Sequence, residues 1–365
     1  MQESPSRDDD AEVNAAIELM TGHVQEADPR FRPGDFWASL LETNIAMISE
    51  EGIKRLKRHV GNNYFNWIFS SPRDPQVINA VRKMFRYRAP QALAAKCGDA
   101  SGLRTMTSPD RQSLTRFQRR LYSLCVAMAW EEALRSDKFG LTADLEEPSV
   151  GDPITVSYRG RLTTQDLANS VVECSYGLDG LRSCTPPVEA DDPGLRVAEL
   201  GAGYGRLAFV FAQRTAASYF VFDIPPALAT AEWYLSETLG SNRVMSFSPE
   251  HTSESIANIA PGQVALFTPD QLELFPNRSF SLCQSISTLP EMPESQALMY
   301  LDLLAAKSSA GLFMKQWISW RNEADGVEFS EDRYEPGPEW KLVDRRTDPV
   351  QPMFFNRFWA RVPQP

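Results

Sequence analysis

The chain has few histidines and cysteines, and neither type occurs in a metal-binding or redox spacing. It holds three histidines and five scattered cysteines, with no Cys-x-x-Cys pair. An odd number of isolated cysteines is typical of small apolar side chains in a reducing compartment, not of a disulfide or zinc framework. We therefore predict a cytoplasmic protein with no metal site, although the sequence does not exclude magnesium.

Long apolar runs and a basic excess are also missing. No stretch approaches the roughly 18 apolar residues of a membrane span, and residues 1–10 are polar and acidic, unlike a secretion signal. The formal net charge is −11, which disfavours nucleic acid as a partner because phosphate neutralisation needs a basic surface. We expect a small-molecule substrate and no membrane span.

The hydrophobic pattern divides the chain into three regions. Residues 1–10 are predicted to be a disordered tail. Residues 11–150 carry apolar side chains at helical spacing, as between Trp37 and Ile48, and are predicted to form a helical lid domain. In residues 151–365 short apolar strands alternate with helices, which predicts a mostly parallel α/β sheet. The sequence leaves open whether the chain forms a homodimer.

A run of basic residues lies in the helical region. It reads Lys54-Arg55-Leu56-Lys57-Arg58-His59 and sits among apolar positions at Ile53, Leu56 and Val60. We interpret the run as the solvated face of a helix, the usual environment of such charges.

Seven segments are predicted as strands of the sheet. The last two are expected to pair as a closing antiparallel hairpin, and Val244–Phe247 is left open between a strand and a loop. The seven are Arg196–Leu200, Tyr219–Phe222, Gln263–Phe267, Phe280–Gln284, Gly311–Lys315, Trp340–Val343 and Phe354–Ala360.

A glycine-rich turn follows the first of these strands and reads Glu-Leu-Gly-Ala-Gly-Tyr-Gly-Arg over residues 199–206. Glycines permit a sharp turn and let a ligand approach the backbone. A dinucleotide fingerprint needs a small residue where this chain has Arg206, and the Gly-Lys-Ser/Thr of a phosphate-binding loop is absent. A nicotinamide oxidoreductase is therefore disfavoured. The next strand ends in an acidic residue, Asp223.

The acidic-x-Gly-x-Gly-x-Gly pattern resembles motif I of the class I S-adenosyl-L-methionine (SAM) methyltransferases. The resemblance implies that the turn of Gly201, Gly203 and Gly205 passes under the methionine part of the cofactor. It also implies that Asp223 accepts hydrogen bonds from the ribose hydroxyls. Glu199 is expected to support the methionine amino group, directly or through water, and its alternative role is structural.

Segments outside this motif resemble one group, the bacterial sugar O-methyltransferases associated with glycosylated natural products and surface polysaccharides. The resemblance implies a Rossmann-like sheet with an antiparallel last strand, a helical N-terminal domain, and methylation of a sugar hydroxyl on a glycosylated natural product or glycan precursor. The alternatives are a phenolic, polyketide or carboxylate acceptor, or a non-catalytic partner subunit. The segments are Asn62–Trp67, Gly151–Ile154, Gln165–Asn169, Asp223–Leu228, Leu289–Met292 and Lys315–Trp317.

The same resemblance assigns further cofactor contacts. Asp270 or Gln271, after the third strand, is expected at the adenine amino group, unless the segment is a simple turn. Gln284 ends the fourth strand, where this fold places the reacting methyl group.

A general base should assist methylation, because sugar hydroxyls are weak acids. Related sequences often carry histidine two residues before a Glu-Met pair, where this chain has Leu289 and Pro290. Glu291 is therefore the leading candidate, and His251 is the second. Lys315 is expected at the rim of the site, binding an acidic acceptor or lowering a hydroxyl pKa, or forming a structural ion pair.

Aromatic residues are expected to bind the acceptor. Tyr64 and Trp67 lie in the predicted lid segment, and Trp317 and Trp320 follow the fifth strand. Aromatic faces suit sugar rings or a flat aglycone, and lid closure excludes water. Core packing is the alternative role for these side chains.

Overall fold

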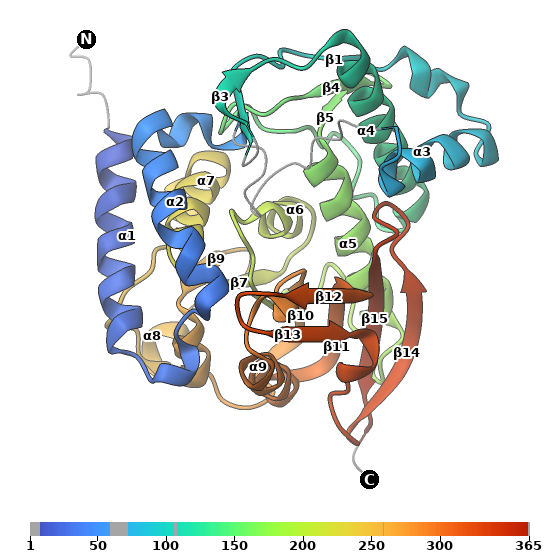
Figure 1. Ribbon diagram of the computed structural model, residues 1–365. Helices are drawn as coiled ribbons and strands as arrows, with labels where there is room; N and C mark the ends of the chain where they lie inside the picture. The colour runs from blue at the N-terminus through green and yellow to red at the C-terminus, as the bar shows by residue number, and fades with distance from the viewer. Residues whose placement is uncertain (1–7, 59–71, 106–107, 258, 364–365) are drawn as a thin grey trace, which may run out of the picture.

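The computed structural model describes residues 8–58, 72–105, 108–257 and 259–363. Its centre is an eight-stranded sheet in the order β14-β15-β11-β10-β6-β7-β9-β8 (Figure 1). The strands are β6 (Arg196–Leu200), β7 (Ser218–Phe222), β8 (Val244–Met245), β9 (Val264–Phe267), β10 (Phe280–Ile286), β11 (Ser308–Trp317), β14 (Trp340–Thr347) and β15 (Phe354–Arg361).

The structure confirms the predicted strands of the sheet and their relative directions. All seven predicted segments form strands, and the open segment contributes the short edge strand β8. The strand pairs β8–β9, β9–β7, β7–β6, β6–β10 and β10–β11 are all parallel. Strand β15 runs antiparallel to both of its neighbours, β11 and β14. This is a Rossmann-like α/β sheet with an antiparallel last strand.

Alternate residues of the central strands enter two separate hydrophobic cores. In β6, Val197 packs into the core that holds α5 to α7, and Ala198 packs into the core that holds α9. Burial on both faces explains why these strands read as continuous apolar runs. The helices of this region are α5 (Gln165–Arg182), α6 (Arg206–Arg214), α7 (Ala227–Leu239), α8 (Ser253–Ala257) and α9 (Glu294–Lys307).

The N-terminal region is mainly helical but also contributes strands. Its elements are α1 (Asp9–Glu26), α2 (Asp35–Glu51), α3 (Pro75–Arg86), β1 (Lys96–Cys97), β2 (Leu103–Thr105), β3 (Ser108–Gln112) and α4 (Arg116–Ser136). Strand β1 pairs with β4 (Val156–Tyr158), which pairs with β5 (Arg161–Thr163), so a small sheet crosses the predicted boundary at residue 150. Helix α1 begins at Asp9, inside the predicted tail, because the Asp8 side chain accepts a hydrogen bond from the Ala11 amide and caps it.

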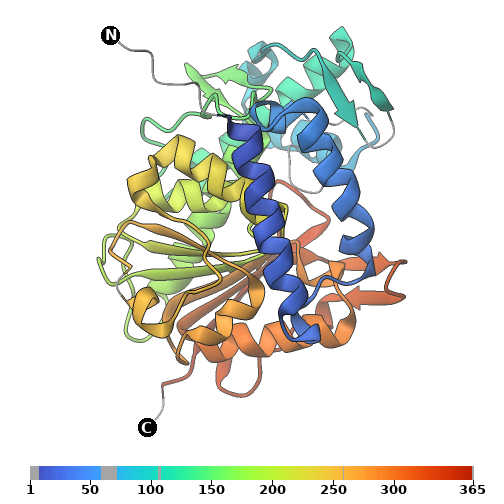
Figure 2. The same ribbon diagram turned by 90° about the vertical axis from the view of Figure 1, so that its left-hand side faces the viewer.

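Residues 28–37, which join α1 to α2 and include the first residues of α2, are fixed to the sheet region, and we call them the strap. Asp325, between β12 (Ser319–Asn322) and β13 (Val327–Ser330), accepts hydrogen bonds from the amides of Asp35 (3.0 Å) and Phe36 (3.3 Å). The Gln296 side chain of α9 donates to the Arg32 carbonyl oxygen at 2.7 Å. Figure 2 shows α1 crossing the ends of the strands beside this segment.

The basic run is a solvated face only in part, which corrects the prediction: Lys54 is exposed, whereas two other cations of the run are not. Lys57 and Arg58 are buried in a short 3-10 helix, Ile53–Arg58. The Lys57 ammonium pairs with Glu147 at 2.5 Å, and Arg58 forms a bidentate pair with Asp152. Partners distant in sequence satisfy these charges, so burial is possible. Within the described residues, no helix has the length and apolar character needed to cross a membrane.

Candidate active site

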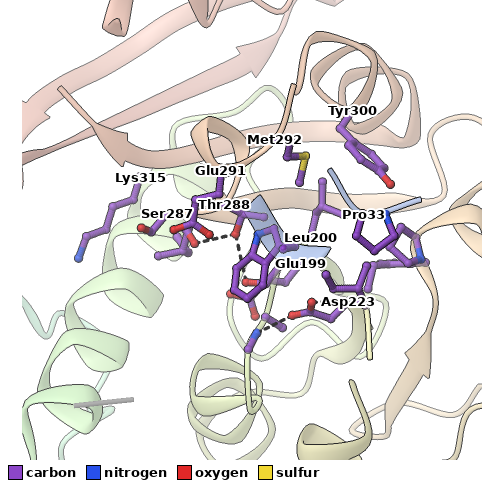
Figure 3. Close-up of a pocket in the computed structure, with 18 of the residues that line it drawn as sticks. Pro33, Glu199, Leu200, Asp223, Ser287, Thr288, Glu291, Met292, Tyr300 and Lys315 are labelled. Carbon is purple, nitrogen blue, oxygen red and sulfur yellow. Dashed lines mark hydrogen bonds between the residues drawn. The ribbon is translucent and has the colours of Figure 1, made fainter. Parts of the chain in front are cut away.

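A cavity of about 290 Å³ opens beyond the carboxyl ends of β6, β7, β10 and β11. The chain proceeds from β6 to β7 and β9 on one side, then returns to β10 and β11 on the other. Ligands of open α/β sheets bind at such a reversal of strand order. Figure 3 shows Asp223 on one side of the cavity, with Ser287, Glu291 and Lys315 on the other.

The glycine turn forms the floor of this cavity, and its three glycines have different roles. Gly203 has φ +59°, lines the cavity, and would carry a Cβ with no atom within 4 Å. A Cβ on Gly201 would lie 2.0 Å from the Thr288 hydroxyl oxygen. Gly205 does not line the cavity, because it lies at the N-cap of α6 and packs against Leu235. Gly203 is therefore the position that leaves room for a ligand.

Asp223 closes the turn from the end of β7. Its two carboxylate oxygens accept hydrogen bonds from the amides of Gly203 and Ile224, each at 2.7 Å. Burial raises the pKa of this carboxyl to about 7, despite the opposing effect of those two bonds. The carboxylate faces the cavity and retains lone pairs for a ligand with hydroxyl groups.

Glu199 and Gln284 are joined through the hydroxyl group of Tyr219. The Tyr219 hydroxyl donates to the Glu199 carboxylate at 2.6 Å and accepts from the Gln284 amide at 2.7 Å. Burial raises the pKa of Glu199 to about 8. Glu199 lines the cavity, whereas Gln284 is fully buried behind it and does not.

Glu291 is the predicted base that the structure places in the cavity. It follows β10 in a short 3-10 helix, Leu289–Glu291, and is 7% exposed. Within the described residues, no hydrogen-bond partner of its carboxyl is found. Burial, with a smaller contribution from the charge of Asp223, raises its pKa well above the ordinary value. Such a carboxyl is suited to exchanging a proton with a ligand.

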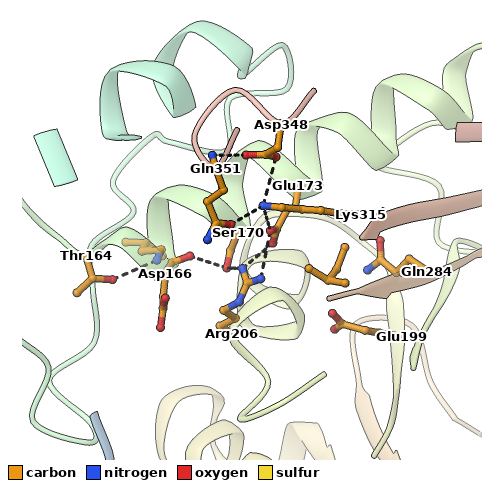
Figure 4. A network of polar contacts seen from close by, with 12 residues as sticks. Thr164, Asp166, Ser170, Glu173, Glu199, Arg206, Gln284, Lys315, Asp348 and Gln351 are labelled. Carbon is orange, nitrogen blue, oxygen red and sulfur yellow. Dashed lines mark hydrogen bonds and ion pairs between the residues drawn. The ribbon is translucent and has the colours of Figure 1, made fainter. Parts of the chain in front are cut away.

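Lys315 belongs to a buried ion-pair network (Figure 4). Its ammonium lies 2.8 Å from a Glu173 oxygen, 2.9 Å from the Gln351 amide oxygen and 3.2 Å from Asp348. Glu173 also pairs with Arg206 at 2.5 Å. An ammonium has three hydrogens, and three acceptors already surround this one. Lys315 lines the cavity, but its geometry is that of the structural ion pair named above as an alternative.

Aromatic side chains form another wall. Trp317 and Trp320 both line the cavity, with ring centroids 4.8 Å apart. Residues of the strap, among them Phe31, Pro33 and Trp37, line it as well. The strap was not predicted as part of the site, because no motif in its sequence signals that role.

Three other predicted residues, all within the described part of the chain, lie away from the cavity wall. His251 contacts the Ser246 carbonyl oxygen and the Phe267 ring, so the structure does not support it as the base. Asp270 bonds His23 at 2.9 Å, and Gln271 bonds Thr268 and Ser248. Neither Asp270 nor Gln271 lines the cavity, because these contacts hold them in the turn. Tyr64 and Trp67, like the whole predicted lid segment Asn62–Trp67, lie outside the described residues. Across the described part of the chain, no group of three or more His, Cys, Asp or Glu residues could hold a metal ion.

No protein-family model and no curated protein sequence matches this chain. Several solved structures match this chain in fold. Magnesium protoporphyrin IX methyltransferase from Synechocystis PCC 6803 with bound SAM is 15% identical, with a TM-score of 0.34 over 47% of this chain and 71% of that one. Geranyl diphosphate methyltransferase in complex with SAM is 8% identical, with a TM-score of 0.36 over 52% and 84%. The [4+2]-cyclase SpnF is 14% identical, with a TM-score of 0.33 over 47% and 76%.

We predict that Lys315→Met destabilises the protein strongly. The substitution leaves Glu173 and Asp348 with one buried cation fewer, and breaking a buried pair costs about 3–5 kcal/mol. Urea unfolding would measure the loss. Lys138→Met is the control, because its pair with Asp179 is exposed and should contribute less than about 1 kcal/mol. Equal, small effects of the two substitutions would contradict a structural role for Lys315.

Proposed function

We propose that this protein is a SAM-dependent O-methyltransferase. One observation carries the proposal: the open glycine position and the Asp223 carboxylate meet in a single cavity at the switch point of the sheet. The motif resemblance makes Asp223 the acceptor of the ribose hydroxyls. The solved structures of magnesium protoporphyrin IX methyltransferase and geranyl diphosphate methyltransferase contain SAM, which is consistent with this proposal.

The charge of the cavity fits a cationic cofactor. Four carboxyl groups line it, those of Asp166, Glu199, Asp223 and Glu291, and burial raises the pKa of each. Three cations also line the cavity: Arg206 and Lys315 are paired with Glu173, and Arg32 donates to the Ala27 carbonyl oxygen. A ligand that brings positive charge would stabilise the ionised carboxylates.

In the proposed reaction, Glu291 accepts the proton of the acceptor hydroxyl. Bound SAM supplies a methyl group on a cationic sulfonium, so the protein need not protonate a leaving group. The aromatic wall and the strap orient the acceptor and exclude water, and alignment of the hydroxyl supplies much of the rate enhancement. A carboxyl with a raised pKa is a stronger base when ionised, which suits this step.

We further propose a sugar hydroxyl as the methyl acceptor. The proposal is supported by the motif resemblance and by the Trp317–Trp320 pair, because aromatic faces pack on the apolar faces of sugar rings. The same pair suits a phenolic or polyketide acceptor, which is the second candidate. Methyl-labelled SAM, the protein and a metabolite extract from a strain lacking the gene would separate them. After acid hydrolysis, label in a monosaccharide fraction supports the sugar, and label in an aglycone supports the alternative.

Gly203→Ala should abolish cofactor binding without unfolding the protein. The new methyl group enters open space in the cavity, and the left-handed backbone costs about 1–2 kcal/mol. Isothermal calorimetry with S-adenosylhomocysteine measures binding. Gly140→Ala is the matched control, because Gly140 has φ +73°, open surroundings and no place in the cavity wall. Similar binding by both variants would exclude a ligand at the turn.

The affinity for S-adenosylhomocysteine should rise with pH up to about 7. The Asp223 pKa is raised to about 7, so the carboxylate that accepts the ribose hydroxyls is lost below that pH, by about tenfold per unit. Asp166, Glu199 and Glu291 titrate in the same cavity, so the variant Asp223→Asn is required. Calorimetry should show weak, nearly pH-independent binding for the variant. If the affinity of Asp223→Asn depended on pH as steeply as that of the unmodified protein, the titration would belong to another carboxyl.

Glu291→Gln should lower kcat by about 10²- to 10⁴-fold while S-adenosylhomocysteine still binds. The amide keeps the shape of the side chain but takes no proton. In the unmodified protein, kcat should increase with pH as Glu291 ionises, and the variant should lose this dependence. His251→Asn tests the other predicted base and should keep full activity. The reverse pattern in the two variants would reject Glu291.

A further inference from the structure

Helix α5 carries a stripe of buried polar side chains on the face toward the cavity. Asp166, Asn169, Ser170 and Glu173 follow one another at spacings of three, one and three residues, which places them on one face of a helix. All four are buried. Buried polar groups normally have hydrogen-bond partners, so each member of the stripe needs one.

Three members of the stripe have partners within the protein. Ser170 and Glu173 accept hydrogen bonds from Arg206, and Asp166 accepts one from the Tyr204 hydroxyl at 2.9 Å. Asn169 is the exception. Asn169 is 4% exposed and lines the cavity, yet its side-chain oxygen has no hydrogen-bond partner within the described part of the chain. This oxygen is therefore a buried acceptor without a described partner, on a residue of the cavity wall.

Arg206 lies beside Ser170 and Glu173 of the stripe and offers hydrogen-bond donors (Figure 4). Its Nη1 donates to Ser170 and Glu173, and its Nη2 donates once, to Glu173. A guanidinium has five N–H groups, so the Nε hydrogen and one Nη2 hydrogen remain, on the same edge. That edge is a fork that matches a carboxylate. Arg206 also lines the cavity.

We propose that the α5 stripe and Arg206 bind the α-amino acid end of the cofactor. Arg206 donates hydrogen bonds to the carboxylate of the cofactor, and Asn169 and Asp166 accept hydrogen bonds from the ammonium of the cofactor. The inference rests on the proposed function, and it adds residues that the glycine motif does not predict. Lys315 is excluded as the carboxylate ligand, because Glu173, Gln351 and Asp348 already occupy its ammonium.

Two ligands that differ only in this end provide the test. S-adenosylhomocysteine carries the amino acid, whereas 5′-methylthioadenosine ends in a methylthio group. We expect Asn169→Leu to weaken S-adenosylhomocysteine binding by about 10- to 100-fold in calorimetry, the effect of a lost hydrogen bond to a charged group. Binding of 5′-methylthioadenosine should change less than about twofold, because it does not reach the stripe.

Gln165→Met is the matched control on the same helix. The Gln165 side-chain oxygen is also buried and without a described partner, but it does not line the cavity. Asn169→Leu should not lower Tm, because it removes a buried oxygen without a described partner. Gln165→Met also removes the hydrogen bond from the Gln165 amide nitrogen to the Gln76 side-chain oxygen, at 3.2 Å, so it should lower Tm slightly. The control should still bind both ligands normally. Asp166→Asn is a second variant and should weaken only S-adenosylhomocysteine.

The outcomes separate the inference from the proposed function. If the unmodified protein binds neither ligand, the proposed function fails and the inference fails with it. If it binds both, and Asn169→Leu weakens both equally or neither, the function stands and the amino acid site is wrong. A selective loss for S-adenosylhomocysteine, with an unchanged control, supports the inference.

Discussion

The ion pairs of Glu173 are the interaction on which the rest of the site depends. This carboxylate from α5 lies between Arg206 at the start of α6 and Lys315 in β11. Asp348, next to β14, completes the network at 3.2 Å from Lys315. Four elements distant in sequence are thereby joined behind the cavity. Because the desolvation cost of each charge is recovered only when the others are in place, this arrangement fixes α5 relative to the glycine turn.

The network also determines the electrostatic character of the cavity. Its two cations both pair with Glu173, and Asp223 and Glu291 have no cation as a described partner. Burial then raises the pKa values of both carboxyls, whereas Asp348, beside Lys315, has a lowered pKa despite its burial. The same residue type thus serves as a fixed counter-ion in one place and as a titrating group in another, according to its neighbours.

The sheet and the glycine turn were predictable because their signals are local. A strand buried on both faces must be apolar along its length, and the turn needs glycine where φ is positive, as at Gly203. The polar network could not be predicted in this way. Lys57 resembles a surface residue until Glu147, 90 positions later, pairs with it. Asp270 likewise appears available for a ligand until His23 of α1 contacts it.

The strap ties part of the helical N-terminal region to the sheet region. Phe31 is 2% exposed and packs against Tyr300 of α9, with ring centroids 6.0 Å apart. Gly34 leaves room for Pro293 and Asp325, because a Cβ there would lie 2.6 Å from the proline ring. Moving the strap would expose an aromatic side chain and remove two hydrogen bonds from the start of α2. The strap is therefore a fixed wall of the cavity, so residues from both ends of the chain define the space left for an acceptor.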